Sequence, residues 1–405
     1  PLAQEPEETP AVFRLASGET FAATSFGAPL TQPVAGEVVF TTSLVGYPES
    51  MTDPSYRGQI LVFTQPLVGN YGVPGAARDA SGLLAHFESE RVQPQAVIVS
   101  DYARKYSHWR AVESLGAWCA RHGVPALTGV DTRAVVHLLR EGGSTSGCVA
   151  PVRSDDVVAA AVEADAAMAV AGDPNARCLT AEVCVTRPVR YRATPGSVAP
   201  GTKPLHVAVL DCGAKNNILR CVLDRGCDVT VLPSVAGSDW DAQVISGAIG
   251  QVDGLLLSNG PGDPRSNLHA VAALKRVMSV RPTLPIFGIC MGHQLMGLAA
   301  GADVYKMTYG NRGHNQPVLC LDANGQSGLC YVTSQNHGFA LDDASFTGGW
   351  MPWFRNANDQ SNEGLRHRAR PWRSVQFHPE AKGGPEDTDW LFEAFVADVR
   401  AYAAS

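Results

Sequence analysis

The stretch FGICMGHQLMG, residues 287–297, places a cysteine between two glycines. The apolar run LPIF (284–287), which precedes the cysteine, predicts a short buried strand. The run HQLMGLAAGA (293–302), which follows it, predicts a helix that ends at a glycine. Cys290 would therefore lie on a turn between a strand and a helix, the geometry of a nucleophile elbow with sulfur in place of a serine oxygen. Gly288 and Gly292 would keep side chains away from this sharp turn. The short pattern alone fits a structural cysteine in a tight junction equally well.

The sequence around this turn alternates between strand and helix patterns. Compact apolar runs recur at 205–211, 228–234, 253–258 and 284–290, with helical patterns between them. Such alternation predicts a parallel sheet covered by helices on both faces. Ligands bind at the carboxyl ends of strands in these sheets, where Cys290 and the loop SNGPGDP would both lie. Antiparallel strands and a closing helix, TDWLFEAFVADVRAYA, are expected to follow.

The first part of the chain follows a different pattern. Short β-prone runs separated by turn signals occupy much of 36–149, with two helical stretches, and this order predicts an α+β or β-rich domain. Residues 1–14, acidic and proline-bearing, are expected to form a flexible tail, and the proline-rich basic segment 187–204 a linker. The predicted domains are therefore 15–186 and 205–405.

Composition limits the class of function. The 405 residues are 45% hydrophobic and 18% charged, which is typical of a globular protein without a membrane span. A net charge of −7 argues against a nucleic-acid-binding surface. No secretory signal is recognisable, and the ten cysteines form no CxxC pair or zinc-ligand spacing. These features indicate reduced thiols and a cytoplasmic location.

A second stretch, SVQFHPEA at 374–381, supports a catalytic reading of the cysteine. His378 and Glu380 stand two residues apart, so in extended backbone their side chains leave on the same side. A carboxylate beside an imidazole orients its ring and stabilises the imidazolium, as in nucleophile–base–carboxylate triads. A lone histidine at a strand end would more often be structural. Together with Cys290, the pair favours a Cys–His–Glu triad.

Two further stretches are candidates for substrate binding. In SNGPGDP, Gly260 and Gly262 form a compact loop whose backbone amides can approach a substrate, although a plain turn is the simpler interpretation. No dinucleotide-binding or Walker pattern follows it. In TSQNHGFAL at 333–341, Asn336 and Gly338 could hold the polar ends of a small substrate, and the alternative is an ordinary hairpin.

Taken together, SNGPGDP, FGICMGHQL, SQNHGFAL and QFHPEA resemble the class I glutamine amidotransferases. LDCGAKNNILRCVLDRG and KMTYGNRGHNQP are similar to the glutaminase portion of carbamoyl-phosphate synthetase, and the long run from GEVVFTTSLVGYPESMTDPSY onward resembles the amino-terminal domain peculiar to that subunit. YGNRGHNQP looks more like the fused eukaryotic enzymes of pyrimidine synthesis. The resemblance implies an α/β two-domain protein, with a mixed β/α small-subunit domain and a C-terminal doubly wound, flavodoxin-like domain.

The resemblance also implies roles for matched positions. Cys290 would be the nucleophile, His378 its base and later the acid, and Glu380 the orienting carboxylate. The implied glutamine contacts are Ser55, Gly260, Gly262, Met291, Gln294, Asn336, Gly338 and Phe339. Met291 stands where relatives often have leucine, but the expected contact there is the backbone amide.

The implied reaction is hydrolysis of glutamine through a γ-glutamyl thioester. A carbamoyl-phosphate synthetase subunit or fused domain would receive the ammonia, for pyrimidine or arginine synthesis, and the amino-terminal half would dock it. No metal or organic cofactor is implied for this chain, because ATP and Mg²⁺ would belong to the partner. A stand-alone γ-glutamyl hydrolase and a non-catalytic channel or regulatory module are the alternatives.

Overall fold

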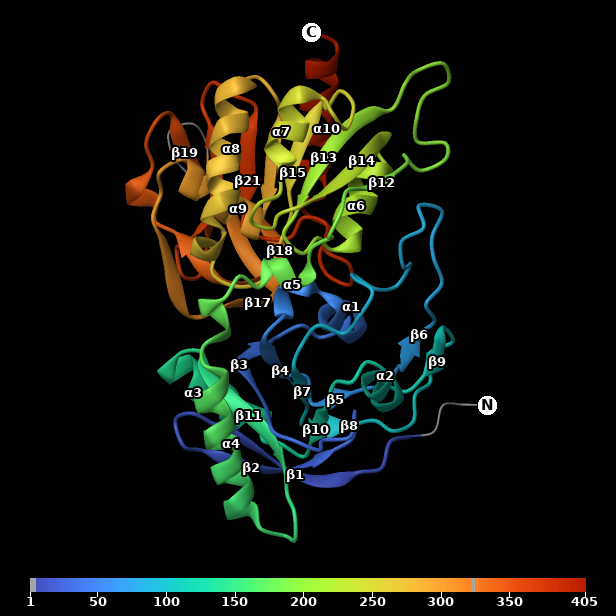
Figure 1. Ribbon diagram of the computed structural model, residues 1–405, viewed down its shortest axis with the longest axis vertical. Helices are drawn as coiled ribbons and strands as arrows, with labels where there is room; N and C mark the ends of the chain where they lie inside the picture. Colours follow the sequence, from blue (N-terminus) through green and yellow to red (C-terminus); the bar gives the residue numbers. More distant parts are fainter. Residues whose placement is uncertain (1–4, 322–324, 326) are drawn as a thin grey trace. The chain divides into compact units, whose positions relative to one another are not determined.

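The computed structural model describes residues 5–321, 325 and 327–405, and contacts within the chain divide it into two compact units. Unit 1 extends to Ala77 and includes Leu84–Arg177 and Thr308–Arg312. Unit 2 comprises Arg78–Leu83, Cys178–Met307 and Gly313–Ser405. Figure 1 labels the helices and strands of both units and colours the ribbon along the sequence.

Unit 1 is built on a closed barrel with the strand order β1-β11-β3-β4-β7-β10-β2. The strands are β1 (Thr9–Leu15), β2 (Thr20–Ser25), β3 (Val34–Thr41), β4 (Gln59–Phe63), β7 (Ala96–Ile98), β10 (Ala126–Thr128) and β11 (Thr145–Pro151). β3, β4, β7 and β10 run parallel, whereas β1 is antiparallel to both of its neighbours. Closure leaves no open sheet edge. The mixed β/α fold expected for this part of the chain is confirmed.

Helices and short strands surround the barrel. They are α1 (Tyr47–Thr52), η1 (Pro54–Tyr56), α2 (Leu115–Arg121), α3 (Thr132–Gly142), α4 (Val157–Ala171), η2 (Pro174–Ala176), and the strand pairs β5 (Leu67–Val68) with β8 (Asp101–Tyr102) and β6 (Val73–Pro74) with β9 (Ala111–Glu113). One buried cluster, which includes Phe13, Val38 and Ile60, gathers side chains from the barrel strands. Another includes Trp118 of α2 and Met51 of α1.

Two features of unit 1 differ from the sequence-based expectation. β1 begins at Thr9, so the second half of the predicted tail 1–14 is a barrel strand, while residues 1–4 lie outside the described residues. Residues 308–312, far along the sequence, also belong to unit 1: Ser144 N–H donates to Thr308 O at 2.8 Å and Thr42 N–H to Arg312 O at 3.2 Å. Pairing between distant segments leaves no local sequence pattern.

Unit 2 is organised around one large sheet of the order β12-β14-β13-β15-β16-β21-β20-β19-β17-β18 within the described residues. Its parallel strands are β13 (Leu205–Asp211), β14 (Cys227–Pro233), β15 (Gly254–Leu257), β16 (Ile286–Ile289) and β21 (Trp372–Val375). Numbered along the chain, these strands have the order 2-1-3-4-5, which is the flavodoxin-like arrangement. The predicted doubly wound fold is confirmed.

The other strands extend this sheet beyond its parallel part. They are β12 (Val189–Tyr191), β17 (Val304–Leu321), β18 (Ser327–Leu341), β19 (Trp350–Asn356) and β20 (Asn362–His367). β19 pairs antiparallel with β17 and β20, and β20 with β21. The antiparallel strands predicted for this region are therefore present.

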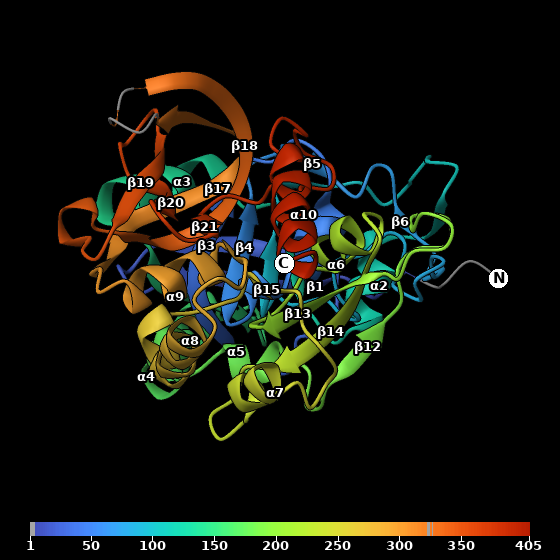
Figure 2. The same cartoon turned by 90° about the horizontal axis from the view of Figure 1, so that it is seen from above.

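Helices cover both faces of the parallel strands, as Figure 2 shows. They are α6 (Asn216–Leu223) and α10 (Trp390–Ala403) on one face, and α7 (Trp240–Ser246), α8 (Leu268–Val280) and α9 (Met291–Ala299) on the other, with α5 (Thr180–Val183), η3 (Pro264–Asn267) and η4 (Asp343–Ser345) in connections. Each face has its own buried cluster, one around Phe287 and Phe395 and one around Leu255 and Leu274. The turns at the ends of the parallel strands therefore rest on a sheet whose two faces are both packed against buried side chains.

The predicted linker 187–204 is not a free connector, which corrects the sequence-based expectation. It contains β12, which pairs antiparallel with β14, and the change of unit falls between Arg177 and Cys178. Asp228 of β14 holds the segment: Arg192 Nη1 lies 2.6 Å from its carboxylate and the N–H of Ala193 donates to it at 3.0 Å. The basic residues that suggested a solvated linker are its anchors.

None of the helices in the part of the chain that the structure describes is long and apolar enough to cross a membrane.

Candidate active site

Cys290 occupies the turn between β16 and α9. Its backbone has φ 53° and ψ −102°, a left-handed conformation that non-glycine residues rarely adopt and that costs free energy. Its N–H donates to Val375 O of the neighbouring strand β21 at 2.9 Å. The predicted strand–cysteine–helix turn is present, and its backbone strain is typical of a functional elbow.

The flanking glycines are required by close packing. A Cβ atom on Gly292 would lie 2.2 Å from Leu257 O of β15, and one on Gly288 would lie 2.7 Å from Gly292 O. No side chain fits at such distances. Glycine at both positions therefore lets the start of α9 approach the sheet closely enough to hold the elbow.

His378 and Glu380 form a buried pair after β21. His378 Nδ1 lies 2.7 Å from Glu380 Oε1, and both side chains are almost fully buried. Because a carboxylate only accepts hydrogen bonds, Nδ1 carries the proton and donates it. Nε2 of His378 has no hydrogen-bond partner in the described part of the chain. The ring is thus oriented with one nitrogen available for proton transfer.

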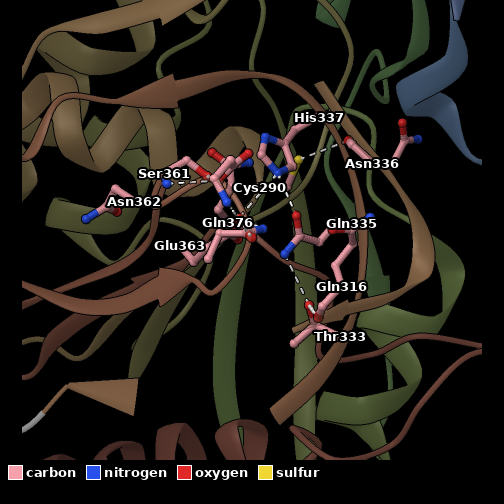
Figure 3. Close-up of polar contacts among 12 residues, drawn as sticks. Cys290, Gln316, Thr333, Gln335, Asn336, His337, Ser361, Asn362, Glu363 and Gln376 are labelled. Atoms are coloured by element: carbon pink, nitrogen blue, oxygen red, sulfur yellow. Dashed lines mark hydrogen bonds and ion pairs between the residues drawn. The ribbon is translucent and has the colours of Figure 1, made fainter. Parts of the chain in front are cut away.

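Strand β18 brings the cysteine and the histidine to the same stretch of backbone. The N–H of His378 donates to Ser334 O at 2.8 Å, and Cys290 Sγ donates to Asn336 O at 3.6 Å, the contact drawn in Figure 3. Two residues along a strand span only about 7 Å. The two predicted triad members, far apart in sequence, therefore both contact the same short stretch of β18.

Lys215 is a site residue that the sequence reasoning missed. Its Nζ lies 2.8 Å from Glu380 Oε1, and it is buried at the start of α6. Burial alone would raise the pKa of Glu380, but the charges of Lys215 and His378 outweigh burial and lower that pKa to about 2. The carboxylate is therefore ionised at neutral pH. The only sequence signal was the position of the lysine just after β13.

A further histidine stands near the same charges. His314 of β17 is half-buried, and burial and then the charge of Lys215 lower its pKa to about 4. It is therefore neutral at physiological pH, which leaves Lys215 as the cation beside Glu380.

The loop SNGPGDP lies beside the elbow. The N–H of Gly292 donates to Ser258 O at 3.0 Å, which ties the loop to the first turn of α9. A Cβ atom on Gly260 would lie 2.1 Å from Cys212 O, and Gly262 has φ +85°. Met291 is the first residue of α9, so its N–H has no partner within the helix. The loop is therefore tied to the turn that follows the cysteine, where the Met291 N–H belongs to the first turn of α9.

The residues predicted to bind glutamine fall into two groups. In unit 2, Gln294 Nε2 donates to Phe339 O at 3.0 Å and to Gln376 Oε1 at 3.1 Å, which links α9 to β18. Asn336 and Gly338 lie on the same strand. Ser55 belongs to η1 of unit 1, where its N–H donates to Asp53 Oδ1 at 2.9 Å. Its contact with glutamine stays a prediction.

Among the described residues, no group of three His, Cys, Asp or Glu side chains could hold a metal ion. The expectation that this chain needs no cofactor stays a prediction.

Comparisons with known proteins identify the families of the two parts of the chain. The model of the family "Glutamine amidotransferase class-I" matches residues 208–397, and that of "Carbamoyl-phosphate synthase small chain, CPSase domain" matches 13–149. The chain is 49% identical over 402 residues to a carbamoyl phosphate synthase arginine-specific small chain of Aspergillus fumigatus, covering 99% of this chain and 82% of that protein. A protein of the same name from Yarrowia lipolytica is 49% identical over 401 residues, covering 98% and 84%.

Among solved structures, a glutamine amidotransferase from Thermotoga maritima is 16% identical, with a TM-score of 0.36, and the match covers 50% of this chain and 87% of that one.

Proposed function

The chain belongs to the family of carbamoyl phosphate synthase small chains, and from this premise we propose that it hydrolyses glutamine and passes the ammonia to a synthetase partner. Its amidotransferase domain is the glutamine-hydrolysing component of the enzyme. The observation that best supports the proposal is the convergence of Cys290 and His378 on Ser334 and Asn336 of β18.

In the proposed first step, the sulfur of Cys290 attacks the side-chain amide carbon of glutamine. His378 accepts the thiol proton at Nε2, because Nδ1 already donates to Glu380. The carbonyl oxygen becomes an oxyanion that accepts hydrogen bonds from the N–H of Met291 and from the loop at Gly260. One such donor is typically worth about 3–4 kcal/mol of barrier.

In the second step, His378 returns the proton to the departing nitrogen, the C–N bond breaks, and ammonia leaves behind a γ-glutamyl thioester on Cys290. Water then attacks the thioester while His378 accepts its proton, and glutamate is released as the thiol reforms. Glu380 stays ionised throughout and stabilises the imidazolium between these transfers.

Released ammonia would become protonated in water, so its use in a synthesis requires a partner that takes it up directly. We propose that this partner is a carbamoyl phosphate synthetase large subunit, and that the amino-terminal part of the chain docks it. The similar fungal proteins are named arginine-specific, which favours arginine synthesis. The resemblance of YGNRGHNQP to the fused pyrimidine-pathway enzymes keeps that pathway as the alternative.

Trapping the thioester tests the proposed chemistry. After mixing with glutamine and rapid acid quenching, mass spectrometry should find a γ-glutamyl group on the peptide that contains Cys290, and none in Cys290→Ala. Glutamate release without any adduct on that peptide would argue for direct attack by water, and so against the covalent mechanism.

A further inference from the structure

Behind the proposed active site, β18 carries a row of buried polar side chains. Thr333, Gln335 and His337 alternate along the strand, so they share one face, and each is at most 4% exposed. Figure 3 shows them in sequence from Gln316 toward Cys290, with Glu363 of β20 beside them. Buried polar groups require hydrogen-bond partners, so the direction of each bond in this row can be deduced.

The direction is set by a backbone carbonyl. Thr333 Oγ1 lies 2.8 Å from Gln316 O, which can only accept, so the single hydroxyl proton points there. Thr333 Oγ1 must then accept from Gln335 Nε2 at 3.2 Å. The amide oxygen of Gln335 consequently faces His337 Nε2 at 3.0 Å, and that ring nitrogen must donate.

The other ring nitrogen of His337 also faces an acceptor. Nδ1 lies 3.0 Å from Phe339 O, a backbone carbonyl. A neutral imidazole has only one N–H, so it would leave a nitrogen lone pair against one of these two oxygens. The contacts are satisfied together only when both nitrogens carry protons, which makes the ring an imidazolium.

A buried cation needs a counter-charge, and Glu363 is placed to provide it. Its Oε1 lies 3.8 Å from His337 Nε2, and both side chains are at most 1% exposed. Oε1 also accepts from Asn356 Nδ2 at 3.2 Å and from Ser361 Oγ at 3.5 Å, whereas Oε2 has no hydrogen-bond partner among the described residues. A protonated carboxyl would therefore lack an acceptor for its own proton at Oε2.

Burial acts in the opposite direction, because it raises the pKa of Glu363 to about 8. The pair must therefore place one proton on either the carboxyl or the ring. His337 faces two carbonyl-type acceptors, whereas Glu363 Oε2 faces none in the described part of the chain, and this difference favours the proton on the ring. The neighbouring His293 stays neutral, since burial and then the charge of His337 lower its pKa to about 3.

We propose that His337 is a buried imidazolium paired with the Glu363 carboxylate, and that this ion pair positions the Asn336–Phe339 segment for glutamine binding. The proposal rests on the proposed function of the Cys290 site. Phe339 O accepts from both His337 Nδ1 and Gln294 Nε2, so the charged ring fixes the carbonyl that orients Gln294. Three residues earlier on the same strand, Asn336 O accepts from Cys290 Sγ. Glu363 and His337 are thus positioning residues.

The direct test is nuclear magnetic resonance of the full chain labelled with ¹⁵N at histidine. One histidine, assigned to His337 by its loss in His337→Gln, should show both ring nitrogens protonated at neutral pH, whereas a single protonated nitrogen would overturn the proposal. This measurement needs no activity, so it stands even if the proposed function fails.

Kinetics of Glu363→Gln give the second test. Without the carboxylate the ring should lose one proton, and KM for glutamine should rise roughly tenfold or more, the size of a lost hydrogen bond to a charged group. The value of kcat should change much less. Glu363→Asp, which keeps the carboxylate, should have a KM between those of Glu363→Gln and wild type. The control Glu386→Gln, at an exposed position, should have the wild-type KM. An unchanged KM in folded Glu363→Gln would overturn the positioning role, whereas wild-type protein without Cys290-dependent glutamate release would instead refute the proposed function.

Discussion

The ammonium group of Lys215 lies 2.8 Å from the carboxylate of Glu380, the same carboxylate that accepts from His378 Nδ1. The buried carboxylate therefore has one cationic neighbour, the lysine, and one hydrogen-bond donor, the histidine ring. An ionised carboxylate in such a place is stable only while it is paired, because burial of a lone charge is costly. The lysine thus helps keep Glu380 able to orient and stabilise the histidine.

Replacing Lys215 by methionine should impair glutamine hydrolysis and shift its pH dependence. Without the ammonium group, burial raises the pKa of Glu380, whose charge the mechanism requires. The acidic limb of kcat/KM should therefore move to higher pH, with a loss at neutral pH of roughly tenfold or more, corresponding to the loss of one charge-assisted hydrogen bond. A pH profile of glutamate release measures this, and the exposed Lys275→Met provides the control. An acidic limb at its wild-type position would contradict the assigned electrostatics.

Glu380→Gln should lower stability in a pH-dependent way. The pKa of Glu380 is lowered to about 2 from an ordinary 4.5, so its ionised form stabilises the fold above about pH 4.5, and this contribution is lost as pH falls toward 2. The wild type should exceed the variant by about 3 kcal/mol at neutral pH, given about 1.4 kcal/mol per unit of pKa. Urea unfolding at several pH values should show the gap narrow below pH 4.5. Glu141→Gln, at an exposed position, is the control. A difference in unfolding free energy between wild type and Glu380→Gln that stays constant with pH would count against this prediction.

Gly260→Ala should damage the loop that is proposed to stabilise the oxyanion. The new Cβ atom would lie 2.1 Å from Cys212 O, so backbone must move. The value of kcat should fall roughly 100-fold or more, the typical effect of losing one oxyanion donor. The matched control is Gly142→Ala at the end of α3, where a Cβ atom meets nothing within 4 Å. Equal kcat in the two folded variants would exclude the loop from catalysis.

The sequence predicted the parts of the fold that depend on local patterns. Alternating apolar runs and helices predicted the doubly wound sheet, and the glycines around Cys290 predicted the elbow. The spacing of His378 and Glu380 predicted their side-by-side arrangement. Each of these predictions rests on patterns of a few neighbouring residues, which in the sheet repeat along the chain.

The features that sequence reasoning missed depend on long-range contacts. Barrel closure joins β1 to β11, whose pairing no local pattern announces. The segment 187–204 looked like a linker because its anchor, Asp228, stands on a distant strand. Lys215 and Glu363 were missed for the same reason, since a single charged residue beside an apolar run does not reveal its partner.

The central claim is that Cys290 attacks glutamine and that the ammonia feeds a synthetase. The most direct measurement compares wild type with Cys290→Ser, each combined with a carbamoyl phosphate synthetase large subunit, for glutamate release and for carbamoyl phosphate formation from glutamine or from added ammonia. The account predicts that the variant loses glutamate release and glutamine-dependent synthesis while ammonia-dependent synthesis persists. Glutamate release at the wild-type rate by Cys290→Ser would contradict it.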